Sequence, residues 1–438
     1  MKNDKLPVAI IGGGPVGLAA AAHLVKRNER FILFEAGASV GANVLDWAHV
    51  KIFSPWKYNI DKAAKELLLQ TGWKSPDKES ISTGSELYTN YFLPLYNHAL
   101  IKPFVHLNSK VIAIGRKGLD KMKSANREAQ PFVIQVRQGT NTILFEARAV
   151  IDASGTWHNN NPIGSGGVFA FGELENSDKI LYGIPDVLNV HKNRYKNKNV
   201  LVAGSGHSAI NSILELDKLK DEFPETQIKW VLRKNNIKDV YGGQEKDALP
   251  ARGALGIKIE ELIKNDRISV YTPFQIQEII NENNKLTLIG MQYDIKKALN
   301  GIDEIISNTG NRPDMSFTRE LRVDFDSSVE SVPALADLID PNIHSCGTVR
   351  AHGEAELRQK EKDFYVVGMK SYGRAPTFLM ATGYEQVRSV VAALTGDWEA
   401  AKRVELDLPE TGVCSSDASG NDTCCGTEKD PKKTKSCC

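Results

Sequence analysis

Before Cys346 this 438-residue chain contains no cysteine, and it has only six in all. That part of the sequence therefore has no CxxC redox pair and no zinc site built on paired CxxC spacing. It also has no HExxH zinc motif, and no G-x-S-x-G nucleophile elbow follows a strand. These absences argue against a zinc enzyme and against a serine hydrolase.

An excess of charge of either sign is also missing, since 55 Lys and Arg residues stand against 54 Asp and Glu residues. This balance gives no electrostatic reason to expect a nucleic acid or an anionic membrane as partner, so we expect a small-molecule substrate. The first residues, MKNDKLPVAII, lack the basic, apolar and small-residue order of a signal peptide. We therefore predict a cytoplasmic protein, in a compartment where thiols stay reduced.

One apolar stretch, residues 8–25, approaches the length of a membrane span, but GGGP at 12–15 interrupts it. The pattern instead predicts a strand, a tight turn with Gly12-x-Gly14-x-x-Gly17, and a helix. In such a turn the second glycine lets the backbone approach a pyrophosphate, and the third lets helix and strand pack closely. The next strand, RFILFEAG, ends at Glu35, about where an acid binds the adenosine ribose. This unit predicts a dinucleotide site.

The same unit recurs as KNVLVAGSGHSAINSIL, with Gly204-x-Gly206-x-x-Ala209. Its second strand, QIKWVLRKNN, ends in Arg233 and Lys234 and not in an acid. Cations at this point suit a 2′-phosphate better than a ribose hydroxyl, so the second unit favours NADPH over NADH.

Two further strand-like segments, AVIDASGTW and EIISNTGNRPD, lie on either side of the second unit. This order is expected if the chain leaves one domain, forms a second and then returns. We predict an α/β fold with two Rossmann-like domains, the second inserted in the first. The predicted first domain comprises residues 1–162 and 311–400, the inserted domain residues 163–310, and a disordered cysteine-rich tail residues 401–438.

With these motifs in order over about residues 6–396, the sequence resembles the flavoproteins with two dinucleotide-binding domains, the superfamily of thioredoxin reductases, glutathione reductases and flavin-containing monooxygenases. The resemblance implies FAD in the first unit and NADPH in the second. In that superfamily a late strand, here DFYVVG, ends in a Gly-Asp whose Asp holds the flavin ribityl chain, whereas this chain has Gly368-Met369. The residues predicted to bind FAD are Gly12, Gly14, Pro15, Val16, Gly17, Glu35, Ala36, Ser154, Gly155, Gly368 and Met369. Those predicted to bind NADPH are Gly204, Ser205, Gly206, His207, Ser208, Arg233 and Lys234.

The branch of the superfamily depends on what the chain lacks. Its disulfide reductases need a redox cysteine pair, which is absent before Cys346. Its flavin-containing monooxygenases need none, because their reduced flavin reacts with oxygen to oxidise a soft nucleophile. Their FxGxxxHxxx(Y/F) signature is not present in register, although His191 and Tyr195 keep part of its spacing. We predict a divergent monooxygenase-like, FAD- and NADPH-dependent oxidoreductase acting on a small soft nucleophile or metalloid compound.

Two alternatives stay open. One is an NADPH-dependent reductase that passes electrons to thiols or a metal or metalloid through its C-terminal cysteines. The other is a metal- or metalloid-binding protein in which the flavin domain is secondary. The strings FSPWKYNID, DALPARGALG and GMKSYGRAPTFLMATGYEQV, with a cysteine-rich end, resemble flavoproteins found with bacterial arsenic-resistance genes.

Candidate catalytic residues follow the first acidic strand. The segment GANVLDWAHVKIFSPWKYNID lies along the flavin in this fold, and its aromatic and polar side chains are typical of pocket lining. A later stretch, GGQEKDALPARGALG, is predicted to be a loop whose arginine clamps an anionic substrate or a cofactor phosphate. The candidates are Asn43, Asp46, Trp47, His49, Arg252 and Cys346.

The last residues contain the other five cysteines in a segment rich in Ser, Asp, Lys, Gly and Thr. Such a composition predicts a disordered tail whose thiols are exposed. Soft thiolates on a flexible chain can close around a thiophilic metal or metalloid ion. The predicted ligands are Cys414, Cys424, Cys425, Cys437 and Cys438.

Overall fold

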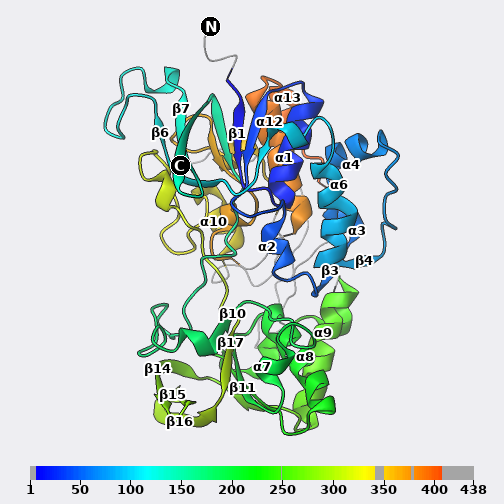
Figure 1. Cartoon of the computed structure of the whole chain (residues 1–438), viewed down its shortest axis with the longest axis vertical. Coiled ribbons are helices and arrows are strands. Elements are labelled where there is room, and N and C mark those ends of the chain that lie inside the picture. Colours follow the sequence, from blue (N-terminus) through cyan, green and yellow to red (C-terminus); the bar gives the residue numbers. More distant parts are fainter. Residues whose placement is uncertain (1–5, 248, 341–349, 376–378, 407–438) are drawn as a thin grey trace, which may run out of the picture.

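The computed structural model describes residues 6–247, 249–340, 350–375 and 379–406, and Figure 1 shows two lobes, one above the other. In the upper lobe five parallel strands lie in the order β18-β9-β1-β2-β5. The residues of β1, VAII, are all apolar and buried, as expected for a central parallel strand covered on both faces. The strands are β1 (Val8–Ile11), β2 (Phe31–Phe34), β5 (Val105–His106), β9 (Ala149–Asp152) and β18 (Phe364–Val366).

Helices cover one side of this sheet and a small antiparallel sheet covers the other (Figure 1). Helix α1 (Pro15–Lys26) begins with a proline at its first position and continues through four alanines that favour helix. It packs against α12 (Met380–Leu394) and α4 (Lys62–Leu69). The antiparallel strands β6 (Lys110–Arg116), β7 (Phe132–Gln138) and β8 (Asn141–Ala147) contribute side chains to the same hydrophobic core.

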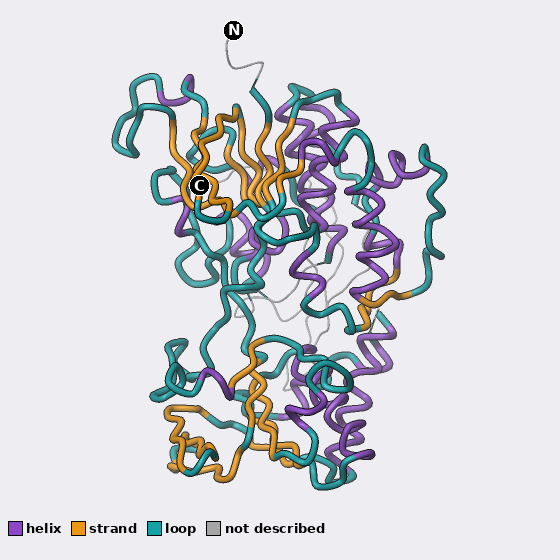
Figure 2. Tube along the Cα trace, viewed as in Figure 1, coloured by secondary structure: helices purple, strands orange, loops and turns teal. Residues whose placement is uncertain are grey.

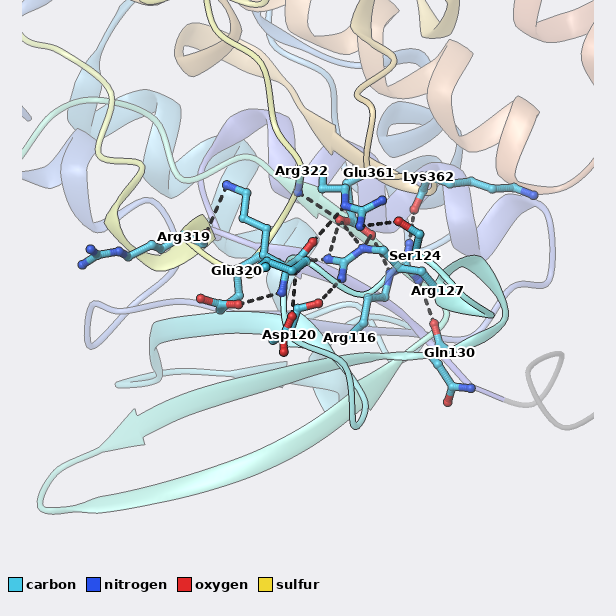
Figure 3. Close-up of polar contacts among 12 residues, drawn as sticks. Arg116, Asp120, Ser124, Arg127, Gln130, Arg319, Glu320, Arg322, Glu361 and Lys362 are labelled. Atoms are coloured by element: carbon cyan, nitrogen blue, oxygen red, sulfur yellow. Dashed lines mark hydrogen bonds and ion pairs between the residues drawn. The ribbon is translucent and has the colours of Figure 1, made fainter.

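A buried arginine–glutamate cluster joins the antiparallel sheet to the segment that enters β18 (Figure 3). Arg116 Nε lies 2.7 Å and Arg127 Nη2 lies 2.8 Å from the carboxylate of Glu361, and all three side chains are buried. The backbone N–H of Arg322 donates to the same carboxylate at 2.9 Å. The guanidinium of Arg116 also stacks on the ring of Phe132, 3.7 Å from its centroid. We call Arg116, Arg127 and Glu361 the clamp.

The lower lobe repeats the parallel architecture with its own sheet, in the order β10-β17-β11-β12-β13. Helices α8 (His207–Glu222) and α9 (Pro250–Lys264) pack against each other beside it. A three-stranded antiparallel sheet completes this lobe with β14 (Gln275–Glu282), β15 (Lys285–Gln292) and β16 (Ile295–Ile302). The parallel strands are β10 (Ile180–Tyr182), β11 (Asn199–Ala203), β12 (Gln227–Val231), β13 (Ser269–Tyr271) and β17 (Glu304–Ser307).

The strands of the lower parallel sheet all come from the chain between β9 and β18 of the upper one, and Figure 2 shows loop segments running between the two sheets. The outgoing and returning segments pair where they pass, because Asn161 N donates to the Gly310 carbonyl at 2.9 Å and Arg312 N to the Asn159 carbonyl at 2.9 Å. The predicted parallel α/β fold is confirmed. Helix α13 (Trp398–Lys402) crosses the predicted boundary between the first domain and the tail.

Candidate functional site

The first glycine turn, between β1 and α1, has a geometry that excludes side chains at two positions. Gly12 has φ +97°, and a Cβ there would lie 2.6 Å from the carbonyl oxygen of Ala153. A Cβ on Gly17 would lie 1.9 Å from the Gly12 carbonyl oxygen, so α1 could not approach the turn. Gly14, the N-cap of α1, has no atom within 4 Å of the place where its Cβ would be. Open space beside the amides of a helix N-terminus fits a pyrophosphate.

Beside this turn lies a cavity of about 740 Å³, at the carboxyl ends of the strands on either side of the point where the strand order reverses. Ligands of open parallel sheets bind at this edge, and the volume lies within the usual range for small-molecule sites. All residues predicted to bind FAD line the cavity except Gly17, which lies behind the turn.

Glu35, at the end of β2, is held in place by the backbone. Its Oε2 accepts a hydrogen bond from Gly13 N at 2.7 Å, and its Oε1 accepts one from Gly37 N at 2.6 Å. Each carboxylate oxygen keeps a second lone pair for a ligand hydroxyl. The arrangement fits the predicted contact with a ribose.

The wall formed by the crossover after β9 contains an ion pair that the sequence did not reveal. Lys370 Nζ lies 2.7 Å from Asp152 Oδ2, and both side chains are fully buried. Lys370 Nζ also donates to Ser154 Oγ at 3.0 Å, and Ser154 Oγ donates to Asp152 Oδ1 at 2.6 Å. Lys370 directly follows Gly368-Met369 in the chain, which is the only sequence signal for this contact.

The turn after β18 brings Gly368 and Met369 to the same cavity. Gly368 has φ +69°, and its N–H donates to Oε1 of Gln386 in α12 at 2.6 Å. Gln386 in turn donates through Nε2 to the ring of His352 at 2.7 Å. Helix α12 begins at Met380, and residues 376–378 lie outside the described residues.

Three of the candidate catalytic residues gather at this cavity. Asn43 lines it directly, together with Trp157. Asp46 Oδ2 accepts a hydrogen bond from Trp157 Nε1 at 2.9 Å, and the rings of Trp47 and Trp157 lie 6.5 Å apart. The cavity therefore has an aromatic and acidic group beside the crossover from β9.

His49 lies elsewhere, against the lower lobe. It hydrogen-bonds the Pro185 carbonyl, and Asp186 and His191 are close enough to affect it electrostatically. Burial lowers the pKa of His49, more than the nearby Asp186 carboxylate raises it. Within the described part of the chain, Nε2 of His49 and Nδ1 of His191 are buried without a hydrogen-bond partner.

Tyr58, which belongs to the same predicted pocket segment, lines a different cavity of about 700 Å³ between α1, α4 and α12. Its neighbour Trp56 is packed in the core at 3% exposure. Residues of this segment thus lie in different places. Asn43 lines the cavity beside the first glycine turn, which we call the cofactor-side cavity, Trp56 lies in the core, and Tyr58 lines the second cavity.

The second glycine turn repeats the first. Gly204 has φ +138°, and a Cβ there would lie 2.3 Å from the Asn308 carbonyl oxygen, whereas Gly206 opens onto free space. His207 begins α8, and its ring lies 5.6 Å from that of Phe53 in β3 (Lys51–Pro55) of the upper lobe. Ser205 and Ser208 flank Gly206 and His207 in this turn.

Arg252 corrects the prediction of a loop arginine. It lies in the first turn of α9, is buried, and makes a bidentate ion pair with Asp247 at 2.8 Å. Its guanidinium also lies 5.9 Å from the ring centroid of Phe53. Arg252 therefore belongs to the contact between the lobes.

The two cations after β12 are exposed. Arg233 Nη1 donates to the Ser165 carbonyl at 3.1 Å, and Lys234 Nζ to the Asp239 carbonyl at 2.8 Å. Their other donors stay available, because a guanidinium has five N–H groups and an ammonium three. Arg312, where the chain crosses between the lobes, donates through Nε to Asn161 Oδ1 at 2.9 Å.

Cys346 and the five predicted metal ligands of the tail lie outside the described residues. Among the residues that are described, no group of His, Cys, Asp and Glu side chains could hold a metal ion. In the same part of the chain, every helix is too short or too polar to cross a membrane.

Comparison with known proteins agrees with this geometry. The sequence profile described as pyridine nucleotide-disulphide oxidoreductase matches residues 9–337. A ferredoxin–NADP reductase from Ligilactobacillus salivarius is 23% identical over 381 residues, which are 86% of this chain and 90% of that protein.

Solved structures share the fold. Bacillithiol disulfide reductase from Bacillus cereus matches with a TM-score of 0.65 at 16% identity, over 89% of this chain and 99% of that one. The cadaverine monooxygenase of desferrioxamine biosynthesis from Erwinia amylovora, solved with FAD, matches with a TM-score of 0.63 at 12% identity, over 92% and 98%. At these identities the likeness concerns the fold alone.

Proposed function

We propose a function from the premise that this chain belongs to the pyridine nucleotide-disulphide oxidoreductase family. It is an FAD- and NADP(H)-dependent oxidoreductase. We propose that it is monooxygenase-like, oxidising a small soft nucleophile or a metalloid compound with electrons from NADPH and molecular oxygen. FAD, when bound, accepts a hydride from NADPH and supplies the electrons for the second half of the reaction.

The repeated glycine turn is the observation that carries this proposal. Gly12 and Gly14 in the upper lobe, and Gly204 and Gly206 in the lower, have the same two features: a glycine at positive φ against a neighbouring carbonyl, and a glycine open to ligand space. Two such turns at the edges of two parallel sheets support two dinucleotides in one chain. Glu35 would bind the ribose of the first, and Arg233 the 2′-phosphate of the second.

Oxygen chemistry is favoured over thiol chemistry by the sequence. No cysteine occurs before Cys346, so residues 1–345 supply no redox pair. Trp157, which lines the cavity, contacts the ring of Trp47 and donates its Nε1–H to Asp46, so an aromatic pair lies beside the cavity.

Stopped-flow spectroscopy tests the proposal. The protein is reduced with one equivalent of NADPH without oxygen and then mixed with aerated buffer while the flavin spectrum is recorded. A transient oxygen adduct, distinct from both the oxidised and the reduced spectrum, is expected. Direct return to the oxidised spectrum, at a rate that no nucleophile changes, would contradict a monooxygenase.

A reductase is the second candidate, because curated relatives such as the one from Ligilactobacillus salivarius are named ferredoxin–NADP reductases. The acceptor would then be an electron-transfer protein, a thiol or a metalloid in place of oxygen. The same anaerobically reduced protein separates the two candidates: rapid reoxidation by ferredoxin or a dithiol, with slow reoxidation by air, identifies a reductase.

The C-terminal cysteines define the finer part of the proposal. We propose that Cys414, Cys424, Cys425, Cys437 and Cys438 bind a thiophilic metal or metalloid and deliver it towards Cys346 and the flavin. The support is chemical, because several soft thiolates in a short polar segment match the preference of such ions. The resemblance to flavoproteins of arsenic-resistance gene clusters points to arsenic as the first ion to try.

A further inference from the structure

Two buried charged side chains, Asp152 and Lys370, determine which hydrogen bonds the hydroxyl of Ser154 forms. Its single proton is donated to Asp152 Oδ1 at 2.6 Å, and the same carboxylate oxygen accepts from Ser154 N at 3.1 Å. One lone pair of the hydroxyl oxygen accepts from Lys370 Nζ at 3.0 Å. Asp152 and Lys370 are both fully buried, so water does not compete for these contacts.

A hydroxyl has one proton and two lone pairs, so Ser154 Oγ has one lone pair left and no proton to donate. Ser154 is only partly buried and lines the cofactor-side cavity, whereas neither Asp152 nor Lys370 does. A ligand group that meets this hydroxyl must therefore be a donor. A phosphate or carbonyl oxygen would meet a lone pair without a hydrogen between them.

The order of the strands indicates which part of FAD lies at Ser154. Across the sheet, β2 carries Glu35 for the ribose, β1 carries the turn for the pyrophosphate, and β9 comes next with Ser154. In FAD the ribityl chain follows the pyrophosphate on the side away from the adenosine. Its hydroxyls are donors of the kind that Ser154 Oγ requires.

The residue at the turn after β18 offers little competition to Ser154 as a hydrogen-bond acceptor. Met369 lines the cavity at the turn after β18, and a thioether is only a weak acceptor. Asp314 also lines the cavity and keeps a carboxylate, one oxygen of which accepts from Ser316 N at 2.9 Å. Asp314 is therefore the rival acceptor that an experiment has to separate from Ser154.

Resting on the proposed FAD site, we propose that Lys370 and Asp152 hold Ser154 as an obligate acceptor for one ribityl hydroxyl of FAD. Ser154 binds the cofactor, and the buried pair positions it. In this chain the Ser154 hydroxyl thus accepts a ribityl hydrogen bond, because Met369 has no carboxylate to accept one.

Binding of FAD analogues to the apoprotein tests the inference without using activity. Flavin is removed, and the Kd values of FAD and of three analogues lacking the 2′, 3′ or 4′ ribityl hydroxyl are measured by flavin fluorescence. Ser154→Ala is expected to weaken FAD binding by roughly two- to tenfold, the usual effect of one hydrogen bond. For the one analogue that lacks the partner hydroxyl, Ser154→Ala should change nothing.

Two further variants test whether the orientation of the Ser154 hydroxyl matters, and not only its presence. Ser154→Thr keeps the hydroxyl and should keep the wild-type preference for FAD over that analogue. Lys370→Met combined with Asp152→Asn removes both charges without leaving one unpaired, and it frees the hydroxyl to rotate. The preference should then fall even though Ser154 is intact.

The inference is overturned if Ser154→Ala weakens FAD and all three analogues equally, or leaves all unchanged. It is also overturned if Asp314→Asn, and not Ser154→Ala, removes the preference. Failure of the wild-type apoprotein to take up FAD would instead overturn the proposed cofactor site itself, so the two failures are distinguishable.

Discussion

Gly14 is the glycine of the first turn that matters for what binds to the protein and not for its internal packing. Gly12 and Gly17 would collide with backbone oxygens if they carried a Cβ, but Gly14 faces open space. Gly14→Val should therefore fold normally and yet leave no room for the pyrophosphate, giving a colourless protein. Absorbance at 450 nm per chain, together with circular dichroism, measures both outcomes.

Gly115→Val is the matched control for that variant. Gly115 lies in β6, opposite Val133, and its nearest neighbour to an added Cβ is the Cβ of Glu320 at an ordinary 3.8 Å. This variant should stay yellow. A Gly14→Val protein that binds FAD as tightly as the control would show that the pyrophosphate lies elsewhere.

Arg233 is expected to determine the choice of nicotinamide cofactor. A charge-assisted hydrogen bond contributes about 1.5–3 kcal/mol, so Arg233→Ala should lower kcat/KM for NADPH by roughly ten- to a hundredfold. The value for NADH should hardly change, because NADH has no 2′-phosphate. Equal losses with the two cofactors would assign Arg233 a structural role.

Single residues also mark the limit of what the sequence could predict. The glycines and Glu35 were predictable because a dinucleotide turn fixes their spacing within one strand–turn–helix unit. Lys370 and Asp152 were not, because they are 218 residues apart and nothing local indicates that they pair. Contacts between distant segments depend on how β9 and β18 come to lie side by side.

At the scale of elements, α9 (Pro250–Lys264) is a helix where the sequence analysis predicted a loop. The stretch that contains its first residues, PARGALG, was predicted to be a loop. Both glycines of PARGALG are required by packing: a Cβ on Gly253 would lie 2.0 Å from the Gln244 carbonyl oxygen, and one on Gly256 would lie 1.8 Å from that of Tyr241. The helix accepts the cost of two glycines because they let another segment approach it. By contrast, the predicted β1–α1 and β11–α8 units were correct because turn and periodicity agree there.

The clamp also acts between elements, and it is expected to make the free energy of unfolding depend on pH. Burial alone would raise the pKa of Glu361, but hydrogen bonds from Arg127 and Arg116 outweigh it and hold that pKa below its ordinary value. The stabilisation is thus complete above the unfolded-state pKa, about 4.3, and is lost as the pH falls through the lower folded pKa. Urea unfolding of the wild type between pH 6 and pH 3 should show this decline.

Glu361→Gln leaves two arginines buried without their carboxylate, which costs about 3–5 kcal/mol for a pair of this kind. Its free energy of unfolding should be lower at pH 6 and should fall less steeply with acid than that of the wild type. Glu79→Gln, at the exposed pair with Lys57, is the control and should change little. Parallel pH curves for Glu361→Gln and wild type would show that the clamp does not titrate.

At the scale of the whole molecule, the five tail cysteines lie outside the part of the chain that the structure describes, and a truncation tests their role. A chain ending at Leu408 retains every element of the described fold, and it lacks all five tail cysteines. Its flavin should still be reduced by NADPH at the wild-type rate, because the truncation keeps both glycine turns. Its affinity for arsenite, measured by calorimetry, should fall at least tenfold, and arsenite should no longer stimulate NADPH oxidation. Equal binding and equal stimulation in both forms would leave the tail without a role in either.

The pairing of the outgoing and returning segments near Asn161 and Gly310 has a consequence for how such a protein is assembled. The stretch between them leaves and re-enters the host at one place, so its two covalent links to the host lie side by side. Removing it would leave two ends close enough for a short linker, and none of the strands of the upper sheet would lose a neighbour. A chain built in this way can exchange its inserted lobe for another while the host half keeps its own parallel sheet.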